Sequence, residues 1–497
     1  MSAAAGTVPA AGDMQSGGFV GNDRLLLGMI LGVVTFWLFA QSTLNIAPDM
    51  QRDLGMAAGT MNSAVAMAAL FSGIFIVVMG GLADRFGRMR VLVIGFWLSI
   101  VGSLLVGLAP AGGVGSGMLL LGRAVQGLSA ACIMPASLAL VKAYWDGAGR
   151  QRAVSMWSIG SWGGAGLGSL FGGLMAQSLG WRWIFFLSVA VSLLGLWLIR
   201  GTPESKVQAS GPYRFDLPGV LAFMVAMVAL QVLVTQGGEW GWTSPTVLGL
   251  MVLTVVAAVA FFRIETDNPH GFVDLGLFGN RTYTGATISN FLINATVGMQ
   301  LVSLMLVQMG GNMTAQQAGM LTLGYAITII AFIRVGEKLL QIFGPRKPMI
   351  WGCLITGVAI ALLMGTHLLI DAYRIVAMVA YALFGLGLAF YATPSTDAAL
   401  ANLPMAQSGS GAGIYKMASS LGAAMGVAIS GAIFATLGAD DFGVRWLEGV
   451  ITFAGRQDNL ALREAAMVAL GFNLFMVLVA IGSIMLTIPK GKAVQTR

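Results

Sequence analysis

The stretch Gly80-Gly81-Leu82-Ala83-Asp84-Arg85-Phe86-Gly87-Arg88-Met89-Arg90 separates two long apolar runs of the chain. The run before it covers residues 60–80 and the run after it covers residues 91–108. Each run is about as long as a helix that crosses the roughly 30 Å hydrocarbon core of a membrane. Only a helix satisfies the backbone of such a segment in lipid. We therefore expect the stretch to be a short basic loop between two membrane-spanning helices.

Twelve more apolar runs have the same character, so the sequence predicts an all-α integral membrane protein with 14 transmembrane helices. Only 9% of the 497 residues are charged and the mean hydropathy is +0.83, which excludes a soluble protein. The expected spans cover residues 25–47, 60–80, 91–108, 117–140, 153–176, 183–200, 217–236, 246–262, 282–308, 318–334, 350–368, 375–394, 411–437 and 466–489.

The spans group into two bundles of six that are joined by a linker. We expect an N-terminal bundle at residues 25–200, a linker with two extra spans at 201–281, and a C-terminal bundle at 282–489, with tails at 1–24 and 490–497. Landmark residues recur between the bundles at offsets of 257 to 259 residues, which indicates two parallel repeats facing a central substrate path. The matching pairs are Gly87 with Gly344, Pro135 with Pro394, and Gly164 with Gly422.

The formal charge of +7 is spread over short loops and forms no patch for nucleic acid. If the loop at residues 80–90 is cytoplasmic, 20 lysines and arginines lie inside and 6 outside, which satisfies the positive-inside rule. We therefore expect a multi-pass protein of the inner (cytoplasmic) membrane with both termini in the cytoplasm. The first 22 residues do not have the pattern of a signal peptide. Cys132 and Cys353 lie in apolar spans, where no disulfide is expected.

The loop at residues 80–90 resembles the cytoplasmic signature of the major facilitator superfamily, Gly-x-Leu-Ala-Asp-Arg-x-Gly-Arg. Its glycines permit a tight turn, and its carboxylate can accept hydrogen bonds from a helix N-terminus or from an arginine. We predict an inner-gate latch that breaks when the gate opens. The alternative is that the arginines only set the topology. The predicted latch residues are Gly80, Asp84, Arg85, Gly87 and Arg88.

Arg123, Gln126 and Gly127 in the fourth span resemble the Arg-x-x-Gln-Gly motif of the same superfamily. A charge within the membrane is costly and usually faces a bundle interior or a water-filled cavity, where it has a function. The alternative is that Arg123 only binds backbone carbonyls and Gln126 and so fixes the helix packing.

The fifth span places four glycines on one helix face, which lets two helix backbones approach closely. This stripe resembles the antiporter motif of drug exporters, although Ser169 stands where that motif has a proline. General tight packing is the alternative, and it is compatible with a rocking motion. The stripe consists of Gly160, Gly164, Gly168 and Gly172. The thirteenth span repeats it as Ala418, Gly422, Gly426 and Ser430.

Further segments resemble the fourteen-spanner drug:proton antiporters of this superfamily, and among them the quinolone exporters, over nearly the whole chain. The resemblance implies proton-driven efflux of amphipathic drugs, including quinolones, lipophilic cations and dyes, by alternating access. We expect a monomer in the lipid bilayer that binds small-molecule drugs and protons and needs no cofactor or metal. The segments are residues 35–42, 181–185, 215–219, 391–397 and 413–420.

The proton-coupling residue departs from the family pattern. Many members have an Asp midway along the first span, where this chain has Ala40. Asp49 is the leading candidate, because it lies about six residues, or roughly 9 Å along a helix, from the cavity-facing stretch. The alternative is that Asp49 is only a solvated residue at the end of the helix. Glu239 is the next candidate. Asp397 is the third, although we favour an ion pair between Asp397 and Lys416 across the inner mouth.

A drug pocket is mostly apolar with a few polar groups. Aromatic faces attract cations, and the 30 methionines offer a surface that can adapt to varied ligands. The candidate cavity residues are Gln41, Asn45, Asn62, Trp157, Trp162, Asn290, Asn294, Gln300 and Tyr325.

The sequence contains no Gly-x-x-x-x-Gly-Lys-Ser/Thr motif, so the energy for transport is expected to come from an ion gradient.

Two rival functions remain open. An exporter of an endogenous metabolite or lipid would have the same fold. A membrane-embedded enzyme or sensor is disfavoured, because His270 and His367 lie outside the spans or at their edges.

Overall fold

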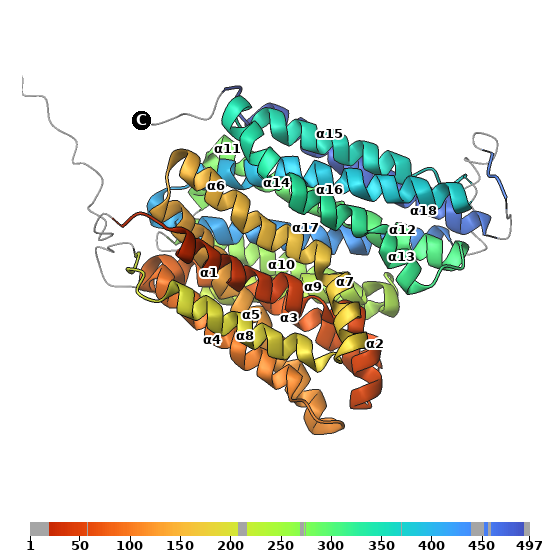
Figure 1. The fold of residues 1–497 in the computed structure, drawn as a ribbon, viewed down its shortest axis with the longest axis horizontal. Helices are drawn as coiled ribbons and strands as arrows, with labels where there is room; N and C mark the ends of the chain where they lie inside the picture. Colours follow the sequence, from red (N-terminus) through yellow and green to blue (C-terminus); the bar gives the residue numbers. More distant parts are fainter. Residues whose placement is uncertain are drawn as a thin grey trace, which may run out of the picture.

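The computed structural model describes residues 19–56, 58–206, 216–268, 273, 275–368, 370–438, 452–455 and 459–491 (Figure 1). Every regular element within these residues is a helix, so the all-α prediction is confirmed. Phe215 and His270 lie outside the described residues. The same holds for the side chains of Asn45, Asn62, Ser169 and Glu239, although their backbones are in helices.

The N-terminal half contains six rods, two of which include a π-helical turn. The first rod consists of α1 (Asp23–Val34), η1 (Thr35–Ala40) and α2 (Thr43–Leu54), and the fifth of α6 (Gly147–Ser158), η2 (Ile159–Gly163) and α7 (Gly164–Ser178). The other rods are single α-helices: α3 (Ala58–Phe86), α4 (Arg88–Gly107), α5 (Gly113–Tyr144) and α8 (Arg182–Ile199).

Two linker helices, α9 (Leu217–Trp240) and α10 (Pro245–Asp267), precede the C-terminal half. Its first rod again contains a π-helical turn and consists of α11 (Arg281–Ala295), α12 (Gly298–Met305) and η4 (Leu306–Gly310). The remaining helices are α13 (Ala315–Leu321), α14 (Leu323–Phe343), α15 (Arg346–Leu363), α16 (Ile370–Ala401), α17 (Ser408–Leu437) and α18 (Leu460–Thr487), with short 3-10 helices η3 (Leu275–Gly279) and η5 (Met405–Gln407).

Twelve helical segments among the described residues are long and apolar enough to cross a membrane. The rod formed by α6, η2 and α7 is not in that set, and neither is α9, whose apolar part is Leu217–Leu230. With these two rods included, the structure is consistent with the 14 predicted spans.

Some predicted boundaries were wrong, because several helices continue past their apolar runs. The last helix begins at Leu460 rather than at residue 466, and its first turns include Arg463 and Glu464, both buried. In the same way α10 continues to Asp267 and includes the buried Glu265. Hydropathy places a boundary at such residues, whereas packing against neighbouring helices keeps them helical.

The two halves lie side by side (Figure 1). Helix α17 of the C-terminal half packs against α3 and α5 of the N-terminal half, and α14 and α16 contact α6. The linker helices pack on each other, and α9 also contacts α3 and α17, so it covers one side of the seam. Large apolar side chains such as Trp97, Val255 and Leu486 are exposed on the outer faces, as expected for surfaces that contact lipid.

Candidate functional site

Asp84, the acid of the predicted latch, joins the two halves. Its carboxylate accepts the backbone N–H of Gly409 at 2.8 Å and that of Ser410 at 3.1 Å, in the first turn of α17. Arg88 donates to the same carboxylate at 2.8 Å and to the carbonyl oxygen of Met405 at 2.7 Å. Asp84 is only 6% exposed. A carboxylate at a helix N-terminus satisfies N–H groups that have no partner within the helix. The carboxylate therefore closes this end of the interface.

The glycines of the latch allow this close approach. A Cβ atom on Gly80 would lie 2.3 Å from the carbonyl oxygen of Gly409, so a larger residue does not fit there. Gly87 has a φ of +122° and separates α3 from α4, a conformation that favours glycine. Arg85 is half-buried in the last turn of α3.

Lys142 and Arg150, which the sequence analysis did not select, complete the closure. Lys142 donates to two backbone carbonyls, Leu400 at the end of α16 and Leu403 just beyond it, where the helix dipole favours a cation. Arg150 of α6 pairs with Asp397 of α16 at 3.0 Å. The predicted pair of Asp397 with Lys416 is therefore wrong. We call the end of the molecule that carries Asp84, Lys142 and Asp397 the gate end.

Arg123 is fully buried and binds the backbone of other segments. It donates to the carbonyl oxygens of Ala64 at 3.1 Å and Ala40 at 2.7 Å, and to the side chain of Gln126 at 2.8 Å. These are the contacts expected of a residue that fixes helix packing. Ala40 is the last residue of η1, so Arg123 also holds the π-helical turn that carries Trp37.

The glycine stripe of the fifth rod faces the first rod. A Cβ atom on Gly164 would lie 3.2 Å from the Cβ atom of Trp37, and one on Gly168 would lie 3.4 Å from the Trp37 carbonyl oxygen. The stripe therefore packs directly against Trp37 and helps to fix its position. The outer members, Gly160 and Gly172, would meet Ile30 and Ser42 at 3.0 Å and 2.9 Å.

The same pairing recurs in the C-terminal half, as expected for a repeat. Cβ atoms on Gly422 and Gly426 would lie 2.1 Å and 1.9 Å from carbonyl oxygens of α11, so α17 and α11 are in backbone contact. Gly127 plays the same part between α5 and α3, because a Cβ atom there would lie 2.5 Å from the carbonyl oxygen of Ala68.

A cavity of about 140 Å³ lies between the two halves. The N-terminal half lines it mainly with residues of two π-helical turns, Trp37 of η1 and Ser161 and Trp162 of η2. π-helical turns are rare and are frequent at functional sites. The C-terminal half contributes Lys416 and Ser419 of α17 together with residues of the ninth and tenth spans.

Four of the nine predicted cavity residues line this space: Trp162, Asn294, Gln300 and Tyr325. Asn290 lies behind Asn294 and donates to Ser419 at 2.6 Å. Trp157 is buried and donates to Ser137 at 2.9 Å. Gln41 is half-buried just after η1. Asn45 and Asn62 have side chains outside the described part of the chain.

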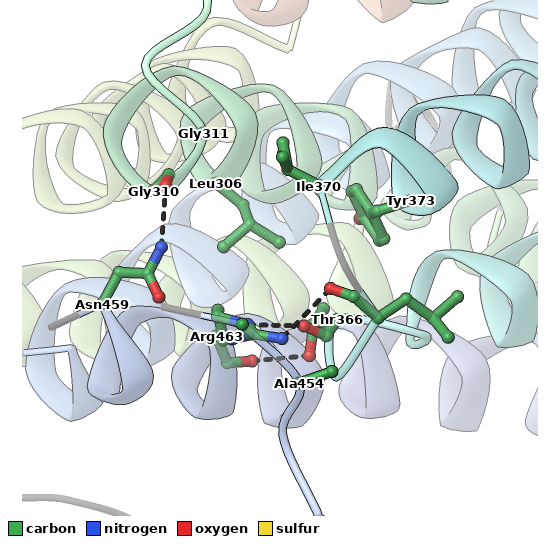
Figure 2. A pocket seen from close by; sticks show the side chains of 11 residues that line it. Leu306, Gly310, Gly311, Thr366, Ile370, Tyr373, Ala454, Asn459 and Arg463 are labelled. Atoms are coloured by element: carbon green, nitrogen blue, oxygen red, sulfur yellow. Dashed lines mark hydrogen bonds between the residues drawn. The ribbon is translucent and has the colours of Figure 1, made fainter. Parts of the chain in front are cut away.

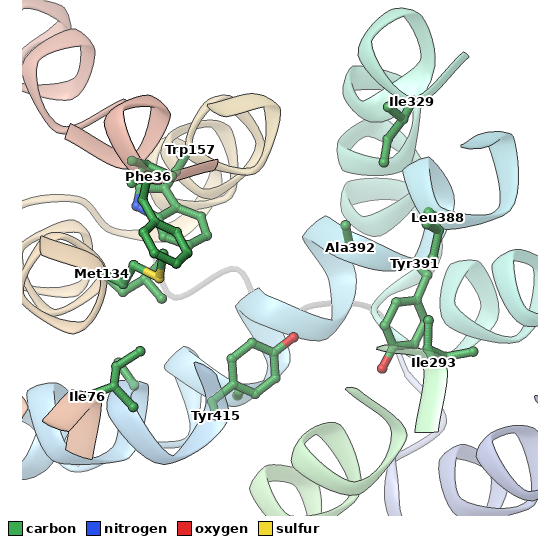
Figure 3. Close-up of a cluster of buried hydrophobic side chains, with 14 of the residues drawn as sticks. Phe36, Ile76, Met134, Trp157, Ile293, Ile329, Leu388, Tyr391, Ala392 and Tyr415 are labelled. Atoms are coloured by element: carbon green, nitrogen blue, oxygen red, sulfur yellow. The ribbon is translucent and has the colours of Figure 1, made fainter. Parts of the chain in front are cut away.

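Residues 391–397 and 413–420, two of the segments that resemble the drug antiporters, contact each other beside the cavity through hydroxyl groups. The Tyr415 hydroxyl is hydrogen-bonded to Ser395 at 2.9 Å, and Ser395 donates to Tyr391 at 3.1 Å. Figure 3 shows Tyr415 and Tyr391 in the buried cluster that also contains Trp157. This network links α17 to α16 between the cavity and the gate end.

Two of the three coupling candidates have described side chains, and these two differ in exposure. The side chain of Asp49 is 47% exposed and pairs with Arg52, one turn away on the same helix. Asp397 is buried and paired with Arg150 across the two halves. The side chain of Glu239 is outside the described part.

A second cavity of about 220 Å³ lies within the C-terminal half (Figure 2). Asn459 donates to the carbonyl oxygen of Gly310 at 2.7 Å, and Arg463 donates to that of Thr366 at 2.7 Å. A transport site has to be reachable from both sides of the membrane, so it lies between the halves. The smaller central cavity is therefore the candidate substrate site.

Two six-helix halves with a mostly apolar cavity between them and a charged closure at one end define a membrane transporter. Residues 28–262, 214–426 and 284–478 match the sequence profile described as Major Facilitator Superfamily. The chain belongs to this family, as the sequence motifs predicted, and it is a multi-pass membrane transporter rather than an enzyme.

The chain is also similar to individual proteins over nearly its full length. It is 43% identical over 479 residues to the "Quinolone resistance protein NorB" of Staphylococcus aureus strain MRSA252, an alignment that covers 96% of this chain and 98% of that relative. The NorB of strain MSSA476 gives the same identity and coverage.

Two solved structures share the fold at low sequence identity. The proton:xylose symporter XylE has a TM-score of 0.63 at 17% identity, covering 94% of this chain and 96% of that one. The human organic anion transporter MFSD10 has a TM-score of 0.59 at 13% identity, covering 91% of this chain and 98% of that one.

Proposed function

We propose that this protein exports amphipathic drugs, quinolones among them, by alternating access between its two halves. The observation that carries the proposal is the 43% identity, over 96% of the chain, to a protein named for quinolone resistance. The central cavity supports it, because Trp37, Trp162 and Tyr325 offer aromatic surface and Asn294 and Gln300 offer a few polar groups.

In this proposal the gate end faces the cytoplasm, in agreement with the positive-inside rule. The latch residues Gly80, Asp84, Arg85, Gly87 and Arg88 hold the cytoplasmic side closed while the substrate leaves. The latch separates when the substrate enters from the cytoplasm. Both termini are then cytoplasmic, and the protein works as a monomer in the cytoplasmic membrane.

Expression in an efflux-deficient bacterium is expected to lower the accumulation of norfloxacin or a lipophilic dye, and a protonophore is expected to abolish the difference. Accumulation is measured by fluorescence in cells carrying the gene or an empty vector. Unchanged accumulation across a broad panel of drugs would favour the exporter of a metabolite or lipid. Loss of export on ATP depletion, with the proton gradient held constant, would contradict proton coupling.

We further propose that Asp397 takes part in proton coupling, ahead of Asp49. A proton on Asp397 would remove the charge that holds Arg150, and a buried pair that loses one charge is strongly weakened. An exposed pair such as that of Asp49 with Arg52 contributes little. Proton binding at Asp397 would thus loosen the closure between the halves.

Asp397→Asn is expected to abolish uphill drug transport and drug-induced proton release while drug binding stays measurable. Asp49→Asn, the matched control, is expected to change transport less than about twofold, because an exposed ion pair contributes little. Both variants are measured in everted vesicles under an imposed pH gradient. The opposite pattern would assign coupling to Asp49, as the sequence alone suggested.

A further inference from the structure

Lys416 is the one cation among the described residues that line the central cavity, and it is buried. Lys416 lies on α17, roughly 12 Å along the helix from Ser408, and it is only 4% exposed. Its ammonium group lies 5.2 Å from the ring centre of Trp157 and 5.9 Å from that of Trp37. Within the described residues no carboxylate forms an ion pair with it.

The other polar groups that line the cavity are neutral. Asn294, Gln300 and Ser419 supply dipoles, and no acidic side chain of the described residues lines this space. Aromatic faces stabilise a buried ammonium group only in part. Since electrostatic interactions are strong where water is scarce, the cavity attracts an anion and disfavours a cation.

A second donor at the cavity lacks an acceptor. The indole N–H of Trp37 is buried and has no hydrogen-bond partner in the described structure. The indole N–H of Trp157, by contrast, donates to Ser137. A buried donor without an acceptor is costly, so an acceptor on a bound substrate would be favourable. Trp37 and Lys416 line the same cavity, and the two oxygens of a carboxylate would suit both donors.

We propose that Lys416 binds the carboxylate of the exported substrate, so that the preferred substrates are aromatic amphipathic acids and zwitterions rather than permanent lipophilic cations. This inference rests on the proposed export of amphipathic drugs and specifies the charge that the cavity selects.

Asn294 donates its amide N–H groups to Asn290 at 2.7 Å and 3.0 Å. Its carbonyl oxygen is therefore the group that can accept from an N–H of the substrate.

The test compares norfloxacin with its methyl ester, which lacks the carboxylate charge. Binding is measured by calorimetry on the full-length protein in lipid nanodiscs. Lys416→Gln is expected to weaken binding of the acid by about 10- to 100-fold, the effect of losing a hydrogen bond to a charged group. Binding of the ester is expected to change little, and Lys416→Arg should retain the preference for the acid. The matched control is Lys338→Gln, at an exposed position of α14, which should bind like the wild type.

Equal affinity of the wild type for acid and ester would overturn the proposal. So would an equal loss of both ligands in a folded Lys416→Gln variant. If Lys416→Gln does not fold, the preference of the wild type and its retention in Lys416→Arg decide the question. If wild-type cells export both compounds, the proposed function stands even when the binding results overturn the role of Lys416. If they export no quinolone, the proposed function itself is overturned.

Discussion

Asp84→Ala is expected to abolish export and to leave the gate end open. The substitution removes the acceptor of two N–H groups at the start of α17 and leaves the buried Arg88 without its carboxylate. The pair with Arg88 lies within the N-terminal half, whereas each N–H group of α17 that loses its acceptor costs about 1–3 kcal/mol. Because the contact to α17 exists only while the halves meet, the cost falls mainly on the closed state. The population should therefore shift toward the open state by roughly two to three orders of magnitude.

The shift is measurable as a distance between the halves. Ala148 and Ala406 are exposed near the gate end, on α6 and η5, and can carry spin labels after the two native cysteines are replaced by alanine. Asp84→Ala should lengthen the distance between the labels and raise norfloxacin accumulation to that of the empty vector. Asp146→Ala is the matched control, since Asp146 is exposed and caps no helix with its side chain. Normal export by Asp84→Ala with an unchanged distance would rule out the latch.

The features that the sequence could predict depend on local signals. An apolar run of about 20 residues is sufficient evidence for a span, because lipid permits few alternatives to a helix. The chemistry of Asp84 allowed two kinds of partner, a helix N-terminus and an arginine, and the structure contains both. The stripe of glycines could be assigned to one helix face from its spacing alone, although its partner, the first rod, could not.

Two kinds of feature could not be predicted from the sequence, namely contacts between the two halves and the π-helical turns. Lys416 and Asp397 were paired because their charges are opposite, whereas the structure places Arg150 beside Asp397 and two indole rings beside Lys416. The π-helical turns also escaped prediction, because an extra residue in one turn leaves no mark in hydropathy or composition. These turns carry Trp37, Ser161 and Trp162, which are three of the four residues that the N-terminal half contributes to the cavity.

Gly164→Leu is expected to abolish export although the protein still enters the membrane. A Cβ atom at this position already lies 3.2 Å from the Cβ atom of Trp37 and 3.5 Å from the backbone nitrogen of Leu38. The rest of a leucine side chain has to push η1 away from α7. Overpacking of this kind costs about 1–3 kcal/mol. The displaced segment η1 contains Trp37, so its displacement moves Trp37 into the substrate site. Leucine does not hinder membrane insertion, because it is favourable in a transmembrane helix.

Two variants of the same helix separate this effect from a general loss of stability. Gly173→Leu is the matched control, because a Cβ atom on Gly173 meets nothing within 4 Å. Gly168→Ala should also keep export, since its Cβ atom would make an ordinary contact at 3.4 Å. Immunoblots of the membrane fraction give the amount of protein, and norfloxacin accumulation gives the export. If Gly164→Leu exported normally at a wild-type membrane level, close packing of the fifth rod on η1 would not be required for transport. Loss of export in Gly173→Leu as well would show that bulk anywhere on α7, rather than pressure on Trp37, stops the transporter.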